Sequence, residues 1–352
     1  MTYRDGLYQA MRQAMAEHSN TVIFGQGVDD HKGIFGTTTD LQKEYGADRV
    51  FDTPLAEEAM TGVAVGMAMN GLYPINTHIR ADFVLLAMNQ IINLAAKYRY
   101  MFGGRFQVPM LIRMVVGRSW GQGAQHSQSL QSLFAHIPGL TVIMPSHPRR
   151  ILDSYAYAVG KWPNPVLSIE HRLMYDLAFD MEGETSNSDT STPFDSFRVR
   201  QGKDVTVVAT SIMVLEALRA ADHLSKAAGI ECEVIDLHCL SHPTRALVLE
   251  SVRKTGRLVV ADTSWRPFGT GAEVCRWICE ENPALLKSPA VTVGMAPSPC
   301  PTAKVLEDIY YPNLTTLSDT IATTVTGRKD HGIPLPNEQS MADIYKRFKG
   351  PF

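Results

Sequence analysis

The chain has 352 residues, of which 45% are hydrophobic and 20% are charged. Its 33 basic and 36 acidic side chains leave a formal net charge of −3, which disfavours nucleic acid or an anionic membrane as the main partner. The length is sufficient for two domains with buried cores. No apolar run reaches the ~18 residues of a membrane span, and the first residues lack the apolar centre of a signal peptide, so we expect a cytoplasmic protein.

The cysteines argue against a disulfide framework, because their number is odd and all lie in the C-terminal half. Two of them are four residues apart on a predicted helix, a spacing that suits half of a metal site, but no second pair of ligands accompanies them. We therefore expect buried thiols that act as small hydrophobic side chains. The five are Cys232, Cys239, Cys275, Cys279 and Cys300.

Helices and strands alternate in the N-terminal half. Apolar residues recur at spacings of three and four from Leu7 to Met15, which predicts a helix, and residues 21–25 follow as a strand. Thr53 and Pro54 are typical of the N-cap and the first position of a helix, which predicts that a second helix begins there. Small residues recur on several sides of this second helix, which predicts that it is buried.

Three further apolar runs, at 108–116, 140–144 and 166–169, predict strands. These runs alternate with helix-like segments at 84–102 and 148–160. Because strands alternate with helices, the sequence predicts an α/β domain over residues 1–176 with a mainly parallel sheet covered on both faces.

The composition then changes. Residues 177–200 contain a run of small polar side chains that cannot bury its own backbone, which predicts an interdomain linker. A second, smaller α/β domain is predicted over residues 201–326, and residues 327–352 are predicted to form a tail. The smaller domain has predicted strands at 205–209, 232–236 and 258–261 and predicted helices at 212–228 and 244–254.

Motifs for common nucleotide enzymes are absent from the sequence: there is no GxxxxGK[ST] phosphate loop, no GxGxxG after the first strand and no nucleophile elbow. A glycine-rich segment from Gly117 to His126 follows a predicted strand, where α/β folds build sites. The residues alone leave alternatives open. His126 also fits a helix cap or an exposed position, Glu57 fits a first-turn carboxylate favoured by the helix dipole, and Phe83 fits an ordinary core aromatic.

Several longer motifs share one resemblance and keep their order over residues 1 to about 322. They are Asp52-Thr-Pro-Leu-Ala-Glu57-Glu, Asp82-Phe83, Ala96-Lys-Tyr-Arg-Tyr-Met-Phe-Gly-Gly104, Gln125-His126-Ser-Gln-Ser, Phe134-Ala-His-Ile-Pro-Gly-Leu and Arg253-Lys-Thr-Gly-Arg-Leu-Val-Val260. With these motifs the chain resembles the beta subunit of thiamine-diphosphate-dependent 2-oxo acid dehydrogenases. The resemblance implies a transketolase-like fold, with an N-terminal pyrimidine-binding domain and a C-terminal domain that mediates assembly.

The resemblance also implies roles for three residues. Glu57 matches the glutamate that hydrogen-bonds a ring nitrogen of the cofactor's aminopyrimidine and so assists its proton transfers. Phe83 matches the aromatic residue that packs on that ring. His126 matches the histidine beside the reacting centre, where an imidazole can relay a proton.

A partner subunit is implied in the same way. The motif that binds the diphosphate and its magnesium, Gly-Asp-Gly followed by a run ending in two asparagines, does not occur in this chain. The family places that motif on a separate alpha subunit, so we expect magnesium to be held mainly there and no metal site on this chain. An assembly of two alpha and two beta chains is the expected catalytic unit.

Some positions depart from the family pattern. Gln26 and Thr77 stand where many members have glutamate, and Arg80 stands where small or aromatic side chains are usual. Arg80, with His78, favours a substrate that carries an additional anionic group; pairing of Arg80 with an acid of the partner chain is the alternative. Trp162 replaces an aspartate in a turn that binds potassium in some relatives, which puts a potassium ion in doubt.

These observations predict the beta subunit of a heteromeric dehydrogenase that decarboxylates a 2-oxo acid and transfers the acyl group to a lipoyl carrier, with a lipoylated acyltransferase core as a further partner. A split transketolase or carboligase that transfers the thiamine-bound group to an aldehyde is the first alternative, kept open by Gln26, Thr77 and Arg80. A non-catalytic scaffold subunit is the second alternative, and retention of Glu57 and His126 weighs against it.

Overall fold

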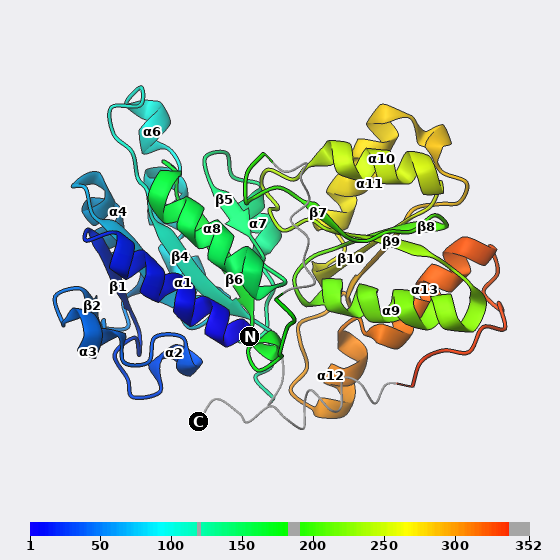
Figure 1. The fold of residues 1–352 in the computed structure, drawn as a ribbon, viewed down its shortest axis with the longest axis horizontal. Helices are drawn as coiled ribbons and strands as arrows, with labels where there is room; N and C mark the ends of the chain where they lie inside the picture. Colours follow the sequence, from blue (N-terminus) through cyan, green and yellow to red (C-terminus); the bar gives the residue numbers. More distant parts are fainter. Residues whose placement is uncertain (118–120, 182–190, 338–352) are drawn as a thin grey trace. The chain divides into compact units, whose positions relative to one another are not determined.

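The computed structural model describes residues 1–117, 121–181 and 191–337, which form two compact units. Of the described residues, 1–117 and 125–181 belong to the first unit, and 121–124 and 191–337 to the second. Each unit has its own β-sheet flanked by helices, so the predicted α/β class is confirmed (Figure 1). Parts of the predicted glycine-rich loop, linker and tail, at 118–120, 182–190 and 338–352, lie outside the described residues.

Six parallel strands form the sheet of the first unit, in the order β2-β1-β3-β4-β6-β5. Nearly every strand residue is buried, as expected for a parallel sheet covered on both faces. The predicted parallel sheet is therefore confirmed. Its strands are β1 (Thr21–Gly25), β2 (Val50–Phe51), β3 (Tyr73–His78), β4 (Leu111–Val116), β5 (Thr141–Ile143) and β6 (Val166–His171).

Two long helices lie side by side in this unit, α1 (Tyr3–Glu17) and α8 (Pro148–Lys161), and both were predicted as helices (Figure 1). A capping box starts α1: Thr2 Oγ1 accepts from the Asp5 amide, and the Asp5 carboxylate accepts from the Thr2 amide, each at 3.1 Å. The shorter helices are α2 (Gly33–Gly36), α3 (Leu41–Tyr45), α5 (Ala81–Val84), α6 (Tyr98–Met101) and α7 (Gln131–Ala135).

Helix α4 (Glu57–Met69) begins at Glu57, so the predicted start at Thr53 and Pro54 is wrong. The Thr53 amide donates to Asp52 Oδ1 at 2.8 Å, and the Ala56 amide donates to the Pro54 carbonyl at 2.8 Å. These bonds hold residues 52–56 in a tight turn that is not helical.

Two other helix predictions for this unit need correction. The prediction that the helix after Pro54 is buried on several sides is wrong, because α4 buries only Thr61, Ala64, Val65 and Ala68. Among the described residues, none lies within 4 Å of a Cβ placed at Gly66. The stretch predicted as one helix over 84–102 is divided into short α, 3₁₀ and π turns, which include η1 (Leu85–Ala87), η2 (Gln90–Ala95) and α6.

The second unit has a five-stranded sheet in the order β11-β10-β8-β9-β7, parallel except for β7. Strand β7 lies within the stretch predicted as linker. It is ordered as a strand because it pairs antiparallel with β9 at the edge of the sheet. The predicted linker therefore ends before residue 197. The strands are β7 (Phe197–Arg200), β8 (Val205–Ala209), β9 (Cys232–Asp236), β10 (Leu258–Trp265) and β11 (Val291–Met295).

Alternate side chains of this second sheet enter two separate cores. Val207 and Val234 pack with helices α9 (Ile212–Ala228) and α13 (Leu314–Thr326) on one face. Val208 and Ile235 pack with α10 (Arg245–Thr255) and α11 (Thr270–Glu281) on the other (Figure 1). The period of two in the strands thus places a layer of helices on each side. Helix α12 (Lys304–Tyr310) completes the unit.

The first residues of the predicted tail pack on the second unit. His331 Nε2 contacts Asp319 Oδ1 at 3.1 Å, and Ile333 packs against the core under α9 and α13. The Pro336 carbonyl accepts from Thr315 Oγ1 at 3.0 Å. Residues 328–337 are therefore bound along α13 although they form no helix or strand.

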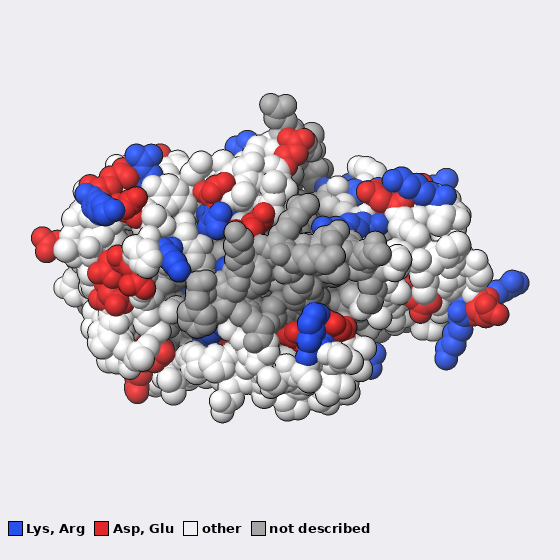
Figure 2. Space-filling view, turned by 90° about the horizontal axis from the view of Figure 1, so that it is seen from below, with Lys and Arg blue, Asp and Glu red and all other residues white. Residues whose placement is uncertain are grey.

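All five cysteines are free thiols. Cys232, Cys239 and Cys300 are buried as predicted, but Cys279 is exposed, because it lies on the outward side of α11. Within the described ranges, no group of three or more His, Cys, Asp or Glu side chains is placed to hold a metal ion, and no helix is long and apolar enough to cross a membrane. On the face shown in Figure 2, basic and acidic side chains are interspersed.

Candidate functional site

Glu57 is the first residue of α4, and Gln26 immediately follows β1. Gln26 Nε2 donates to Glu57 Oε1 at 3.1 Å. Among the described residues, Glu57 Oε2 accepts no hydrogen bond, and the side chain is half-buried. One carboxylate oxygen is thus fixed by an amide while the other is available at the N-terminus of a helix.

The exit of β1 is held beside this helix by Asp52. Its Oδ1 accepts from the amides of Gly27 and Thr53, each at 2.8 Å. A carboxylate that binds two amides of different segments fixes their separation. No role was predicted for Asp52, although it is the first residue of the motif that contains Glu57.

His78, at the end of β3, is buried beside Asn76 and Thr61. Its Nε2 lies 3.2 Å from Asn76 Nδ2 and 3.4 Å from Thr61 Oγ1. Burial lowers the pKa of His78 to about 4, and the nearby Glu57 carboxylate opposes this only in part. The imidazole is therefore neutral at pH 7 and adds no positive charge to that of Arg80.

Arg80 is also buried, with 4% of its surface exposed, and precedes α5. Two residues later, Asp82 Oδ1 accepts from the backbone amide and the Nε2 of Gln128, at 3.1 and 3.0 Å. Burial raises the pKa of the Asp82 carboxyl, against the effect of these hydrogen bonds and of Arg80. The Asp82–Gln128 hydrogen bonds tie the loop that carries His126 to the segment after β3. The role of Gln128 was not predicted, because Asp82 is 46 residues away in the chain.

The structure brings Phe83 and His126 together. The two ring centroids lie 5.2 Å apart with an interplanar angle of 81°, an edge-to-face contact. Phe83 is 38% exposed and His126 is half-buried, so both rings are accessible. Within the described parts of the chain, no hydrogen bond or ring contact joins this pair directly to Glu57.

These residues share one edge of the sheet. Gln26 follows β1, His78 and Arg80 lie at or beyond the end of β3, and the loop of His126 follows β4, which are neighbouring parallel strands. The carboxyl ends of parallel strands are where α/β folds place ligands. A half-buried carboxylate, an accessible aromatic ring and an imidazole at this edge fit an aminopyrimidine, which offers a ring nitrogen as a partner for Glu57 and a flat surface for Phe83.

The turn in which Trp162 puts a potassium ion in doubt is held by side-chain hydrogen bonds. Trp162 Nε1 donates to Thr141 Oγ1 at 2.9 Å, and Arg99 Nη1 donates to Asn164 Oδ1 at 3.3 Å. Two side-chain oxygens of this region thus accept from N–H groups of the chain, and one donor is itself cationic.

Two family descriptions match the chain: the transketolase pyrimidine-binding domain over residues 1–176, and the transketolase C-terminal domain over residues 197–316. Over 315 residues the chain is 38% identical to pyruvate dehydrogenase E1 component subunit beta-2, mitochondrial, of Oryza sativa subsp. japonica, covering 89% of this chain and 83% of that protein. It is 37% identical over 332 residues to the beta subunit of acetoin:2,6-dichlorophenolindophenol oxidoreductase of Cupriavidus necator, covering 91% and 96%.

A solved structure shares the fold. The chain superposes on one described as a split gene transketolase, inactive beta4 tetramer, with a TM-score of 0.72 and 24% identity, covering 93% of this chain and 98% of that one. At this identity the likeness establishes the arrangement of helices and strands alone.

Proposed function

Since the chain belongs to the E1 beta-subunit family of thiamine-diphosphate-dependent 2-oxo acid dehydrogenases, we propose that it decarboxylates a 2-oxo acid and passes the acyl group to a lipoyl carrier, together with an alpha subunit. The observation that carries the proposal is the Glu57 carboxylate, held by Gln26 through one oxygen and free to exchange a proton through the other. Thiamine diphosphate, when bound, supplies the nucleophilic carbon and takes up the electrons of the broken bond.

The residues of this chain bind, orient and move protons. With thiamine diphosphate bound, Glu57 Oε2 would share a proton with a pyrimidine ring nitrogen, which is general acid–base assistance. The Phe83 ring would pack on the pyrimidine face. His126, which lies edge-on to Phe83, is proposed to relay a proton to the acceptor. The Asp82–Gln128 hydrogen bonds keep the His126 loop in register with β3.

The partner is proposed from the relatives, which include beta subunits of the pyruvate dehydrogenase E1 component. We propose an assembly of two alpha and two beta chains, with magnesium and the diphosphate held mainly by the alpha subunit and a lipoylated acyltransferase as the acceptor. Arg80, rather than the neutral His78, is proposed to favour a 2-oxo acid with a second anionic group. The cytoplasmic location stays a prediction, since the relatives include mitochondrial proteins.

The test uses this chain co-expressed with an alpha subunit from the same genome. Decarboxylation is measured across 2-oxo acids, including dicarboxylic ones, with an artificial electron acceptor, a lipoyl domain or an aldehyde as second substrate. We expect thiamine-diphosphate-dependent reduction of the acceptor and acylation of the lipoyl domain. Product formed only with an aldehyde would assign the chain to the carboligase class instead.

The decisive variant is Glu57→Gln, which keeps the shape and removes the exchangeable carboxylate. We expect kcat to fall by about 10²- to 10⁴-fold, the usual contribution of a positioned acid or base. The matched control is Glu58→Gln: Glu58 is the next residue, is exposed, and accepts from Gln90 Nε2 at 3.1 Å. Undiminished turnover in Glu57→Gln would contradict the proton role and favour a scaffold subunit.

A further inference from the structure

One segment of the first unit presents large apolar side chains to solvent. Helix α6 and the loop after it extend away from the sheet (Figure 1). Tyr100 is 90% exposed, Met101 63%, Phe102 41% and Phe106 42%. Exposed apolar patches of this kind mark sites where another molecule binds.

The aromatic rings of this segment are already ordered. Tyr98 and Phe102 make an edge-to-face contact with centroids 5.5 Å apart at 79°, and Phe102 and Phe106 make another at 5.2 Å and 84°. Rings that hold one another in place lose little conformational entropy when a partner covers them. The arrangement therefore fits a preformed binding surface better than a mobile loop.

The same segment carries uncompensated positive charge. The sequence contains no Asp or Glu between Asp82 and Asp153, while Lys97, Arg99 and Arg105 all fall on or beside α6. None of these three cations forms an ion pair with a carboxylate among the described residues. In a chain whose acidic residues outnumber its basic ones, this is a locally basic surface.

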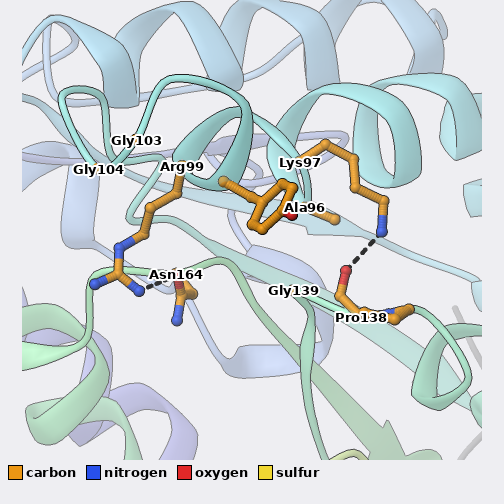
Figure 3. A pocket seen from close by; sticks show the side chains of 9 residues that line it. Ala96, Lys97, Arg99, Gly103, Gly104, Pro138, Gly139 and Asn164 are labelled. Atoms are coloured by element: carbon orange, nitrogen blue, oxygen red, sulfur yellow. Dashed lines mark hydrogen bonds between the residues drawn. The ribbon is translucent and has the colours of Figure 1, made fainter.

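A cleft of about 770 Å³ lies at the base of the segment. Lys97 Nζ donates to the Pro138 carbonyl at 2.7 Å, and Arg99 Nη1 donates to Asn164 Oδ1 at 3.3 Å. Figure 3 shows the two cations reaching down to the loops of Pro138 and Asn164 on opposite sides of the cleft. Gly139 lies between, at φ +100°, and approaches so closely that a Cβ there would be 2.1 Å from the Ala96 carbonyl oxygen.

The lining of the cleft is mainly apolar, and its charged side chains are the two cations Lys97 and Arg99. Each cation meets only a neutral oxygen and retains further N–H groups. Because Asn164 Oδ1 accepts from Arg99, its Nδ2 is left as a donor, and within the described residues it makes no hydrogen bond. An acceptor that enters the cleft can therefore pair with the remaining N–H groups of these cations, and a carboxylate has two oxygens with which to accept.

We propose that residues 97–106 and this cleft are a docking surface for the alpha-type partner subunit, which inserts an Asp or Glu side chain between Lys97 and Arg99 and covers Phe102 and Phe106 with apolar side chains. The surface lies outside the Glu57 site, and the choice of occupant rests on the proposed function. The apolar rim favours a polypeptide over a small anion, because a small anion in the cleft would leave the rings in water.

The experiment measures assembly rather than catalysis. The full chain, alone and with the alpha-type subunit, is studied by sedimentation or interferometry at two salt concentrations. We expect Lys97→Glu with Arg99→Glu to weaken heteromeric association at least tenfold and to reduce its salt dependence. Phe106→Ser is expected to weaken it without changing the salt dependence. Lys97→Gln with Arg99→Gln, which keeps hydrogen-bonding side chains, serves if the reversed variant does not fold.

Matched controls are available on the same chain. Lys32 is an exposed cation of the first unit outside the cleft, and Ile309 on α12 is 77% exposed. Lys32→Glu and Ile309→Ser are expected to leave the affinity within about twofold. Heteromeric affinity unchanged by the double reversal would overturn the proposal, and so would a loss confined to self-association of this chain. The proposed function fails separately, because Glu57→Gln tests turnover in an assembled complex.

Discussion

Gln26 Nε2 donates a hydrogen bond to Glu57 Oε1 over 3.1 Å, joining the exit of β1 to the first residue of α4. The family pattern described above has glutamate at position 26, so an amide here replaces an acid beside the carboxylate proposed to exchange protons. An amide donor orients Glu57 without competing for its proton. Two carboxylates at this separation could not both stay ionised at neutral pH.

The first prediction follows from that replacement. Gln26→Glu puts two carboxylates in contact, so one of them has to take up a proton, and we expect the acid limb of the kcat/KM profile to move upward by about one pH unit or more. Gln26→Ala removes the donor without adding a charge and is expected to lower kcat with no comparable shift. An identical profile for Gln26→Glu and the native chain would show that Gln26 does not tune Glu57.

A second prediction concerns the buried ion pair between β4 and β6. Arg113 binds Glu170 through two hydrogen bonds, Nε to Oε1 at 2.6 Å and Nη2 to Oε2 at 2.8 Å, and both side chains are fully buried. The hydroxyls of Tyr155 and Tyr175 donate to the same carboxylate at 3.1 and 2.5 Å. The Glu170 carboxylate thus accepts hydrogen bonds from Arg113 and from both tyrosines, and these bonds offset the cost of removing the two charges from water.

Removing one member leaves the other charge unpaired. We expect Arg113→Met to cost about 3–5 kcal/mol in the free energy of unfolding, measured by urea denaturation. The double variant Arg113→Met with Glu170→Met is expected to recover part of that loss. As a comparison, the exposed Arg12–Glu44 pair at 2.8 Å is expected to contribute little when Arg12 is replaced by Ala.

A third prediction is a pH dependence of stability. Burial lowers the pKa of His78 to about 4, whereas an unfolded histidine titrates near 6.5. Between these values the unfolded chain binds more protons, so stability is complete above pH 6.5 and declines as the pH falls toward 4. The difference corresponds to about 3 kcal/mol.

The check is the thermal midpoint of the native chain and of His78→Gln between pH 7 and 4.5. The midpoint of His78→Gln is expected to fall less over this range. Burial also lowers the pKa of His147 to about 4, so some acid sensitivity remains in both proteins. Replacing the exposed His136 by Gln should leave the native curve unchanged, and equal slopes for His78→Gln and the native chain would contradict the prediction.

A fourth prediction addresses the residues after α13. Truncation after Gly327 removes the His331–Asp319 contact, the bond between the Pro336 carbonyl and Thr315, and the packing of Ile333. We expect a loss of about 1–3 kcal/mol in the stability of the second unit, measured by differential scanning calorimetry. His331→Ala is expected to reproduce part of the loss, whereas Lys329→Ala, an exposed side chain, is expected to have no effect.

Much of the fold could be predicted because its signals are local. Helix α9 has the predicted bounds of 212–228, and β1, β8 and β9 have theirs, since each is a short apolar run or an uninterrupted stripe. No strand was predicted at 73–78. There Pro74, Asn76 and His78 interrupt the apolar run, and only pairing with β1 and β4 makes it a buried strand.

The sequence by itself determined the α/β class and most of the strands of both sheets. Its motifs also determined the family, and with it the roles expected of Glu57, Phe83 and His126. Only the tertiary structure decided that α4 begins at Glu57, that Gln26 fixes its carboxylate, and that burial keeps His78 neutral. The physical reason is range. Helical and strand periodicity acts over a few neighbours, whereas a hydrogen bond between residues 31 positions apart and the desolvation of an imidazole depend on parts of the chain that meet only when the sheet forms.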